Sequence, residues 1–444
     1  MNTASNTAVA ASPSAGRKFG SSKMTLGLMG GVALEWYDWN IYGVMAAFLS
    51  PRFFPSHDPA VSLLAALAVF GAGFFARPIG AALLGPIADR ISHRGVMLLS
   101  VSAMAICSLV IALMPAYGSI GVWAGVILLA LRLIQGLATG AEAGVANSIA
   151  SELAPPGREG RYMGLIGGTS IQIGIVGSSL VALIVSLLIS KTSMQVWGWR
   201  IPFAVGGVLG LVVIYLRSSL PETLIVSAIH AHSATEDTRI HRRTRDVWKQ
   251  LWDLRLALLA VTMVIGSVQI ANYAWITGLP SIANSIYKEE SSFVFGITMS
   301  MGFIWMFSGP FIGALADRIR PSRAFVIFRL MLVPAFFLMW FYAGNGIGRF
   351  ALVMIVGGTI VGFNMSLYNY IAVTLMPRSI RTTGVAVGYA LGVSIFGGTS
   401  PYLLLWLRHN EAAYLFPVYG AVVAVLSVIV YLIAKRCGHL YVAN

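Results

Sequence analysis

The chain has 444 residues, of which 57% are hydrophobic and 10% are charged, and its mean hydropathy is +0.79. Soluble domains carry about 25% charged residues, so this composition excludes a soluble fold and indicates that lipid is the solvent. The net charge of +14 reflects the sidedness of membrane loops rather than nucleic-acid binding. The two cysteines, Cys107 and Cys437, indicate no disulfide framework.

Apolar windows of 18 or more residues predict an all-α polytopic membrane protein with twelve transmembrane helices. We expect residues 1–23 to form a disordered cytoplasmic tail. They are not expected to form a signal peptide, because the apolar run that follows is long and carries Glu35 and Asp38. The windows lie near residues 25–49, 60–84, 95–115, 121–150, 162–190, 200–217, 256–284, 293–315, 324–343, 350–376, 383–406 and 414–434.

The first window carries ionisable side chains, which are costly in a membrane and therefore indicate a functional site. Glu35, Asp38 and Tyr42 follow spacings of three and four, so that one helix face carries all three about halfway along the span. Desolvation favours the neutral form of a carboxyl group, which can then bind and release protons near neutral pH. We therefore expect Asp38 or Glu35 to carry the coupling proton.

The fourth window repeats this arrangement, with Arg132, Gln135, Thr139 and Glu142 on one helical stripe. At a rise of ~1.5 Å per residue, Arg132 lies about 17 Å from the outer end, near the midplane. Its planar donor fork matches a carboxylate, which predicts either an anchor for an anionic substrate or the cation that couples substrate to proton. The alternative is a permanent structural salt bridge between Arg132 and an acid of the first span. Glu142 fits either a proton relay or a packing hydrogen bond.

Other polar residues lie within the windows. Arg77 is expected to snorkel or to brace a gate, and Arg329 to snorkel. Neutral polar residues at similar depth complete a predicted cavity, with interhelical hydrogen bonding, worth only ~0.6–2 kcal/mol, as the alternative for each. Besides Arg132, the predicted substrate contacts are Tyr42 in the first window, Gln135 in the fourth, Gln172 in the fifth, Gln269, Asn272 and Tyr273 in the seventh, and Asn364 and Tyr368 in the tenth.

A charged turn occurs twice, 228 residues apart, and divides the chain into two similar halves. Asp89-Arg90 follows the second window, and Asp317-Arg318 follows the eighth. Two halves with a site between them are typical of transporters that alternate access around a central cavity. The predicted division is a six-helix bundle at 24–217, a cytoplasmic linker at 218–255, a second six-helix bundle at 256–434 and a cytoplasmic tail at 435–444.

Basic residues predict the orientation, because cytoplasmic loops are enriched in Lys and Arg. With a cytoplasmic N-terminus, 21 of the 30 basic residues lie in inner loops and tails, six in outer loops and three in spans. The opposite orientation would reverse this bias. Both termini are therefore expected in the cytoplasm, with the basic segment 217–255 near anionic lipid headgroups.

Several strings resemble the major facilitator superfamily. The repeated G-x-x-x-D-R turn is similar to the superfamily signature, and other strings resemble its metabolite:proton symporter branch. The resemblance implies the major facilitator fold, with two six-helix halves that rock around a central site. The chain departs from the branch at Glu159 and Thr374, which puts the inner-gate charges of the second half in doubt. The strings that carry the branch resemblance lie at 35–43, 75–80, 132–136, 197–202 and 395–401.

The resemblance also implies that the charged turns form a cytoplasmic gate. In the first turn, Asp89 can accept hydrogen bonds from the unpaired N–H groups at the start of a helix in the other half. The arginines of the same turn can pair with acids such as Glu152 or Glu222 across the gate. The alternative is that these charges only end helices and fix topology. The predicted gate residues are Gly85, Asp89, Arg90, Arg94, Glu152, Gly313, Asp317 and Arg318.

The function implied by the resemblance is secondary active transport, with proton-coupled uptake of a small organic anion. Arg132 favours a di- or tricarboxylate. Symport of a zwitterionic osmolyte such as proline or betaine, and proton-coupled export of a drug or metabolite, remain open alternatives. The expected partners are substrate, protons and the lipid bilayer, with no cofactor, metal, nucleotide or nucleic acid, and no enzymatic activity. The expected location is the bacterial inner membrane, as a monomer.

Overall fold

The structure is a computed structural model that describes residues 22–90, 93–140, 142, 157–218, 244–339, 346–377 and 380–441. Hydrocarbon offers backbone groups no hydrogen-bond partners, so apolar segments that cross it satisfy their N–H and C=O groups within helices. The first half contains α1 (Ser22–Phe53), α2 (Pro59–Arg90), α3 (His93–Leu113), α4 (Tyr117–Ile120), α5 (Trp123–Thr139), α7 (Glu159–Met163), the π-helix η1 (Gly164–Thr169), α8 (Ser170–Leu188), α9 (Lys191–Ser193), η2 (Met194–Gly198) and α10 (Arg200–Ser218).

The second half follows the same plan, with more π-helical turns inside its spans. Such turns are rare and often mark functional sites. Its elements are α12 (Thr244–Asp253), α13 (Arg255–Tyr273), η3 (Ala274–Gly278), α14 (Leu279–Ser285), α15 (Ser291–Ile319), α16 (Pro321–Leu338), α17 (Ile347–Leu352), η5 (Val353–Gly357), α18 (Gly358–Met365), α19 (Tyr368–Thr374), α20 (Arg381–Gly392), η7 (Val393–Gly397), α21 (Ser400–His409) and α22 (Leu415–Arg436).

Each of the twelve predicted windows contains a helix of the described residues. Nine helices in the described part of the chain are long and apolar enough to cross a membrane, or ten if the bent pair Lys191–Gly198 and Arg200–Tyr215 counts as one span. The segment Trp123–Thr139 is apolar but shorter. Helix α1 has 32 residues and carries Glu35 and Asp38 within its length.

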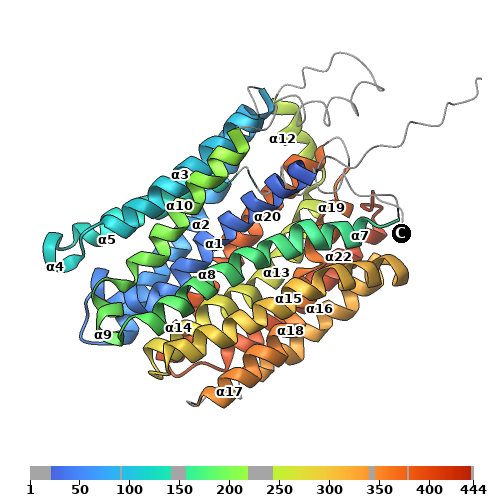
Figure 1. The fold of residues 1–444 in the computed structure, drawn as a ribbon. Helices are drawn as coiled ribbons and strands as arrows, with labels where there is room; N and C mark the ends of the chain where they lie inside the picture. Colours follow the sequence, from blue (N-terminus) through green and yellow to red (C-terminus); the bar gives the residue numbers. More distant parts are fainter. Residues whose placement is uncertain are drawn as a thin grey trace, which may run out of the picture.

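The helices run along one common direction, and segments from both halves meet at the centre (Figure 1). In the first half, α1 packs on α8, α2 on α5 and α3 on α10; in the second half, α13 packs on α20 and α22. The halves meet where α15 packs on α7 and α8, and where α2 packs on α20 and α21. We call the end of the bundle that carries α12 and α7 the linker end, and the end that carries α4, α9 and α17 the far end (Figure 1).

Glycines bring the backbones of α2 and α5 into direct contact. A Cβ at Gly136 would lie 1.9 Å from the carbonyl oxygen of Gly73, and one at Gly80 would lie 2.0 Å from that of Leu137. Small residues at such spacings allow close packing of membrane helices. This approach brings Arg77 of α2 beside α5 at the centre of the first half.

Candidate functional site

The centre of the first half is a buried polar cluster around Asp38. Ser108 of α3 donates a hydrogen bond to Asp38 Oδ1. The Gln135 amide donates to Asp38 Oδ2 at 2.7 Å, and Arg132 Nη1 lies 3.6 Å from the same oxygen. Arg132 Nη1 also donates to Gln135 Oε1 at 2.7 Å. Helices α1, α3 and α5 thus position one carboxylate, one guanidinium and the amide between them.

A second ion pair lies beside the first. Arg77 Nη2 of α2 lies 3.2 Å from Glu35 Oε1 of α1. The guanidinium carbons of Arg77 and Arg132 are each 4.4 Å from the ring centroid of Trp39. One indole therefore contacts the cations of both pairs, at a distance typical of cation–π interactions.

The four charged side chains are almost completely buried, with exposed fractions of 0% for Arg132, 2% for Arg77, 3% for Asp38 and 4% for Glu35. Buried charges are tolerated when they are paired and hydrogen-bonded, and removal of one partner costs about 3–5 kcal/mol. The two cations balance the two carboxylates. A change in the protonation of either acid would therefore leave a net charge in this site.

The guanidinium of Arg132 uses only one of its three nitrogens within the cluster. Its Nε and Nη2 atoms are buried and have no hydrogen-bond partner among the residues that the structure describes. These two nitrogens form one edge of the guanidinium plane, the edge that binds a carboxylate side-on through two parallel hydrogen bonds. The site therefore offers an unused donor edge to an anionic group.

Across from this cluster lie polar and aromatic side chains of α13. The Asn272 amide donates to Gln269 Oε1 at 2.9 Å. The Tyr273 ring stacks on Trp36 with centroids 6.1 Å apart and an interplanar angle of 10°, and lies 5.0 Å from the ring of Phe74. Within the described part of the chain, Gln269 Nε2, Asn272 Oδ1 and the Tyr273 hydroxyl have no hydrogen-bond partner. The second half thus presents unused polar groups next to aromatic rings of the first half.

Comparison with protein-family models matches residues 4–401 to the Major Facilitator Superfamily. The chain belongs to the major facilitator superfamily. It is 33% identical over 422 residues to the alpha-ketoglutarate permease of Escherichia coli K12, covering 93% of each chain. It is 30% identical over 377 residues to a citrate-proton symporter of Salmonella typhi, covering 83% of each. A proline/betaine transporter of E. coli K12 is 29% identical over 413 residues, or 90% of this chain and 80% of that one.

Solved structures agree on the fold of this major facilitator protein. The chain superimposes on the xylose transporter XylE from E. coli, in a partially occluded inward-open conformation, with a TM-score of 0.69 at 17% identity. The match covers 92% of this chain and 96% of that one. The predicted fold class and family are confirmed, and the chain is a membrane transporter related to proton symporters.

Tyr42, Glu142 and Gln172 were also predicted to take part in transport. Tyr42 contacts the cluster around Asp38, because the Arg132 guanidinium carbon is 4.5 Å from the Tyr42 ring, whose hydroxyl donates to the Ala66 carbonyl at 3.0 Å. Glu142 accepts a hydrogen bond at 2.9 Å from Ser100, a different serine of α3 from the one that binds Asp38. Gln172 on α8 is buried. The assigned roles of these residues stay predictions.

The position of Arg329 differs from the predicted one. It is fully buried, so the expectation that it snorkels to the membrane surface is wrong. Its Nη1 donates to the Val264 carbonyl at 2.8 Å and to Ser267 Oγ, and its Nε donates to Asn364 at 3.1 Å. Asn364, a predicted substrate contact, thus uses its carbonyl oxygen on Arg329. Tyr368 is also buried in this half. Arg77 does not snorkel either, because it pairs with Glu35.

The second charged turn caps a helix of the first half, a contact that the sequence predicted for Asp89 of the first turn. Asp317 Oδ1 accepts from the Gly160 N–H at 2.9 Å and Oδ2 from the Arg161 N–H at 3.0 Å. A carboxylate of the second half therefore caps the start of α7 in the first half. Gly313 lies against Gly160, where an added Cβ would be 2.2 Å from the Gly160 carbonyl. Arg318 is exposed. Several predicted gate residues lie outside what the structure describes. These are Gly85, the side chains of Asp89, Arg90 and Arg94, and all of Glu152.

Sequence reasoning included Tyr42 and Tyr273 but missed Trp36, Trp39 and Phe74. Trp39 lies four residues after Glu35 and three before Tyr42, so its position on the charged face of α1 was readable from helical spacing. No group of three or more His, Cys, Asp or Glu side chains that could hold a metal ion occurs in the described residues.

Proposed function

We propose that this transporter takes up a small organic anion, a di- or tricarboxylate, together with protons. The unused Nε/Nη2 edge of Arg132 is the observation that carries the proposal, because a bidentate guanidinium–carboxylate pair combines charge and fixed geometry. The names of the relatives fit this substrate class, since they include an alpha-ketoglutarate permease and a citrate-proton symporter.

In the proposed cycle, a substrate carboxylate binds the free edge of Arg132 and competes with Asp38 for its charge. Once that attraction is weakened, Asp38 takes up a proton, because a buried carboxylate without a cation is unstable in its charged form. Glu35, paired with Arg77 at 3.2 Å, is the second candidate proton carrier. Gln135 and Tyr42 orient the guanidinium, and Gln172, Gln269, Asn272, Tyr273, Asn364 and Tyr368 complete the proposed substrate site.

The proposed motion is alternating access between bundles 24–217 and 256–434, joined by linker 218–255. The Asp317 cap on α7 closes the linker end, and the repeated turn in the sequence assigns a gate role to Asp89 as well. At the far end, Ser281 of α14 donates to the Gly43 carbonyl of α1 at 3.2 Å. Uptake requires these contacts to break in turn. We place the linker end and both termini in the cytoplasm of a bacterium and the monomer in its inner membrane.

A second candidate substrate class is a zwitterion such as proline or betaine. The observation that favours it is the aromatic group formed by Trp36, Tyr273 and Phe74, since aromatic faces bind quaternary ammonium groups. The proline/betaine transporter among the relatives fits this candidate. Its carboxylate would use the same edge of Arg132.

A thermal-shift screen of purified protein separates the two classes. Citrate, 2-oxoglutarate, betaine and proline are each added at about pH 5.5 and about pH 7.5. The proposal predicts stabilisation by a di- or tricarboxylate, and a shift with betaine alone would refute the substrate assignment. Uptake of the stabilising compound into right-side-out vesicles under an imposed inward proton gradient tests direction, because an exporter would lose the compound instead.

A further inference from the structure

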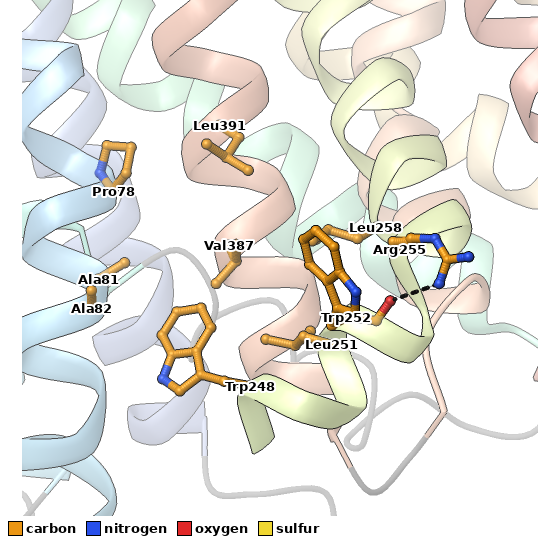
Figure 2. A pocket seen from close by; sticks show the side chains of 10 residues that line it. All are labelled: Pro78, Ala81, Ala82, Trp248, Leu251, Trp252, Arg255, Leu258, Val387 and Leu391. Atoms are coloured by element: carbon orange, nitrogen blue, oxygen red, sulfur yellow. Dashed lines mark hydrogen bonds between the residues drawn. The ribbon is translucent and has the colours of Figure 1, made fainter. Parts of the chain in front are cut away.

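A groove of about 400 Å³ lies near the linker end, between the two halves and the linker helix α12. Ala82 of α2 forms one wall and Val387 of α20 the other, so the walls belong to different halves of the transporter. Figure 2 shows the side chains of both walls turned toward the space between them, with the Trp248 ring of α12 beside it. The lining is apolar except for Arg255 at the start of α13.

The helices that line the groove also carry exposed apolar side chains. Leu83 on α2 is exposed by 61%, Leu259 on α13 by 48%, and Ile395 on η7, which follows α20, by 47%. Exposed apolar surface on adjacent spanning helices faces lipid tails. An apolar groove offers water too few polar partners, so a hydrocarbon chain is its physically favoured occupant.

The mouth of the groove has the chemistry of the membrane interface. Trp252 and Trp248 on α12 are exposed by 72% and 46%, and tryptophan is enriched at headgroup depth. Arg255 is exposed beside them and donates to the Trp252 carbonyl at 3.5 Å (Figure 2). Basic residues next to a spanning helix attract anionic headgroups.

We propose that this groove binds one acyl chain of an anionic glycerophospholipid, with the headgroup beside Arg255. The chain would contact α2 of the first half, α20 of the second and α12 of the linker at once. A bound lipid therefore stabilises the arrangement in which these three elements lie together, and the leaflet at the linker end regulates the transporter. The regulatory effect rests on the proposed alternating access, whereas the binding itself does not.

Native mass spectrometry of the full chain in detergent tests the acyl-chain site, with phosphatidylglycerol as the probe. Ala82→Trp fills the groove from α2, and we expect the variant to lose the bound lipid that the wild type retains. Leu83→Trp is the matched control, because residue 83 is adjacent and exposed but does not line the groove. Equal retention by the Ala82→Trp variant and the wild type, or equal loss in both variants, would overturn the proposal.

A second variant fills the groove from the other wall, so that the test stays decisive if the first variant does not fold. Val387→Trp should also lose the lipid, while its elution on size exclusion and its melting temperature stay those of a folded protein. If Ala82→Trp does not fold, Val387→Trp decides the question by the same criterion, and a folded variant that keeps the lipid refutes the site.

The headgroup is tested by comparing phosphatidylglycerol with phosphatidylcholine of identical acyl chains. Arg255→Gln should reduce the preference for phosphatidylglycerol about fivefold, the effect of one basic residue near a charged leaflet. Arg436→Gln, which removes an exposed arginine at the end of α22, should leave the preference unchanged. An unchanged preference in Arg255→Gln would contradict the headgroup assignment. If a variant takes up substrate at a rate that no longer depends on phosphatidylglycerol, the proposed transport function stands independently of the lipid site.

Discussion

Replacement of Arg132 by lysine keeps a positive charge beside Asp38 but removes the planar edge formed by Nε and Nη2. A carboxylate bound side-on to that edge accepts two hydrogen bonds, and an ammonium group can replace only one of them. A hydrogen bond to a charged group contributes about 1.5–3 kcal/mol. Since 1.4 kcal/mol corresponds to a factor of ten, Arg132→Lys should weaken carboxylate binding about 10- to 150-fold.

The assay is calorimetric titration of the purified variant with the carboxylate identified by thermal shift, at about pH 7.5. Arg436→Lys, at an exposed position at the end of α22, serves as the control and should bind like the wild type. A dissociation constant for Arg132→Lys within about twofold of the wild type would show that charge alone attracts the substrate. The free edge of Arg132 would then not be the carboxylate site.

Three further predictions test coupling, gating and packing. Asp38→Asn and Glu35→Gln together should abolish accumulation driven by a proton gradient, and normal accumulation in the double variant would refute the proton site; counterflow of labelled substrate checks that binding survives. Asp317→Ala should weaken closure of the linker end by about 0.5–2 kcal/mol, the effect of losing a helix cap; faster labelling of cysteines introduced at that end would report it, and unchanged labelling would contradict the gate. Gly136→Ala should lower the melting temperature, because its Cβ would lie 1.9 Å from a backbone oxygen, whereas Gly296→Ala, with nothing within 4 Å, should not; equal melting temperatures for the two would contradict the packing argument.

The helices were predictable because hydrocarbon leaves little choice of backbone structure. The length of the apolar windows located a helix in each of the twelve windows. This includes α1, whose polar residues lie within an otherwise apolar run. Ionisable residues at mid-span were also informative, because each must find a partner. The approach of Arg132 to Asp38 follows that logic.

Which way a side chain faces was harder to predict. Depth along the ninth window suggested that Arg329 reaches the surface, yet it is buried, as are Phe325, Leu332 and Phe336 of the same helix. Those residues follow helical spacing from it, and this periodicity was the better signal. The pairing of Arg77 with Glu35 depends on the contact between α1 and α2, which window lengths do not encode.

The most direct measurement of the central claim is proton movement coupled to substrate. Purified transporter is reconstituted into vesicles without a proton gradient, and the carboxylate is added outside while external pH is recorded. The account predicts that the medium becomes more alkaline as substrate enters, and that Asp38→Asn abolishes this signal while binding substrate. Substrate entry without a pH change in the wild type, or an undiminished signal in Asp38→Asn and in Glu35→Gln, would contradict it.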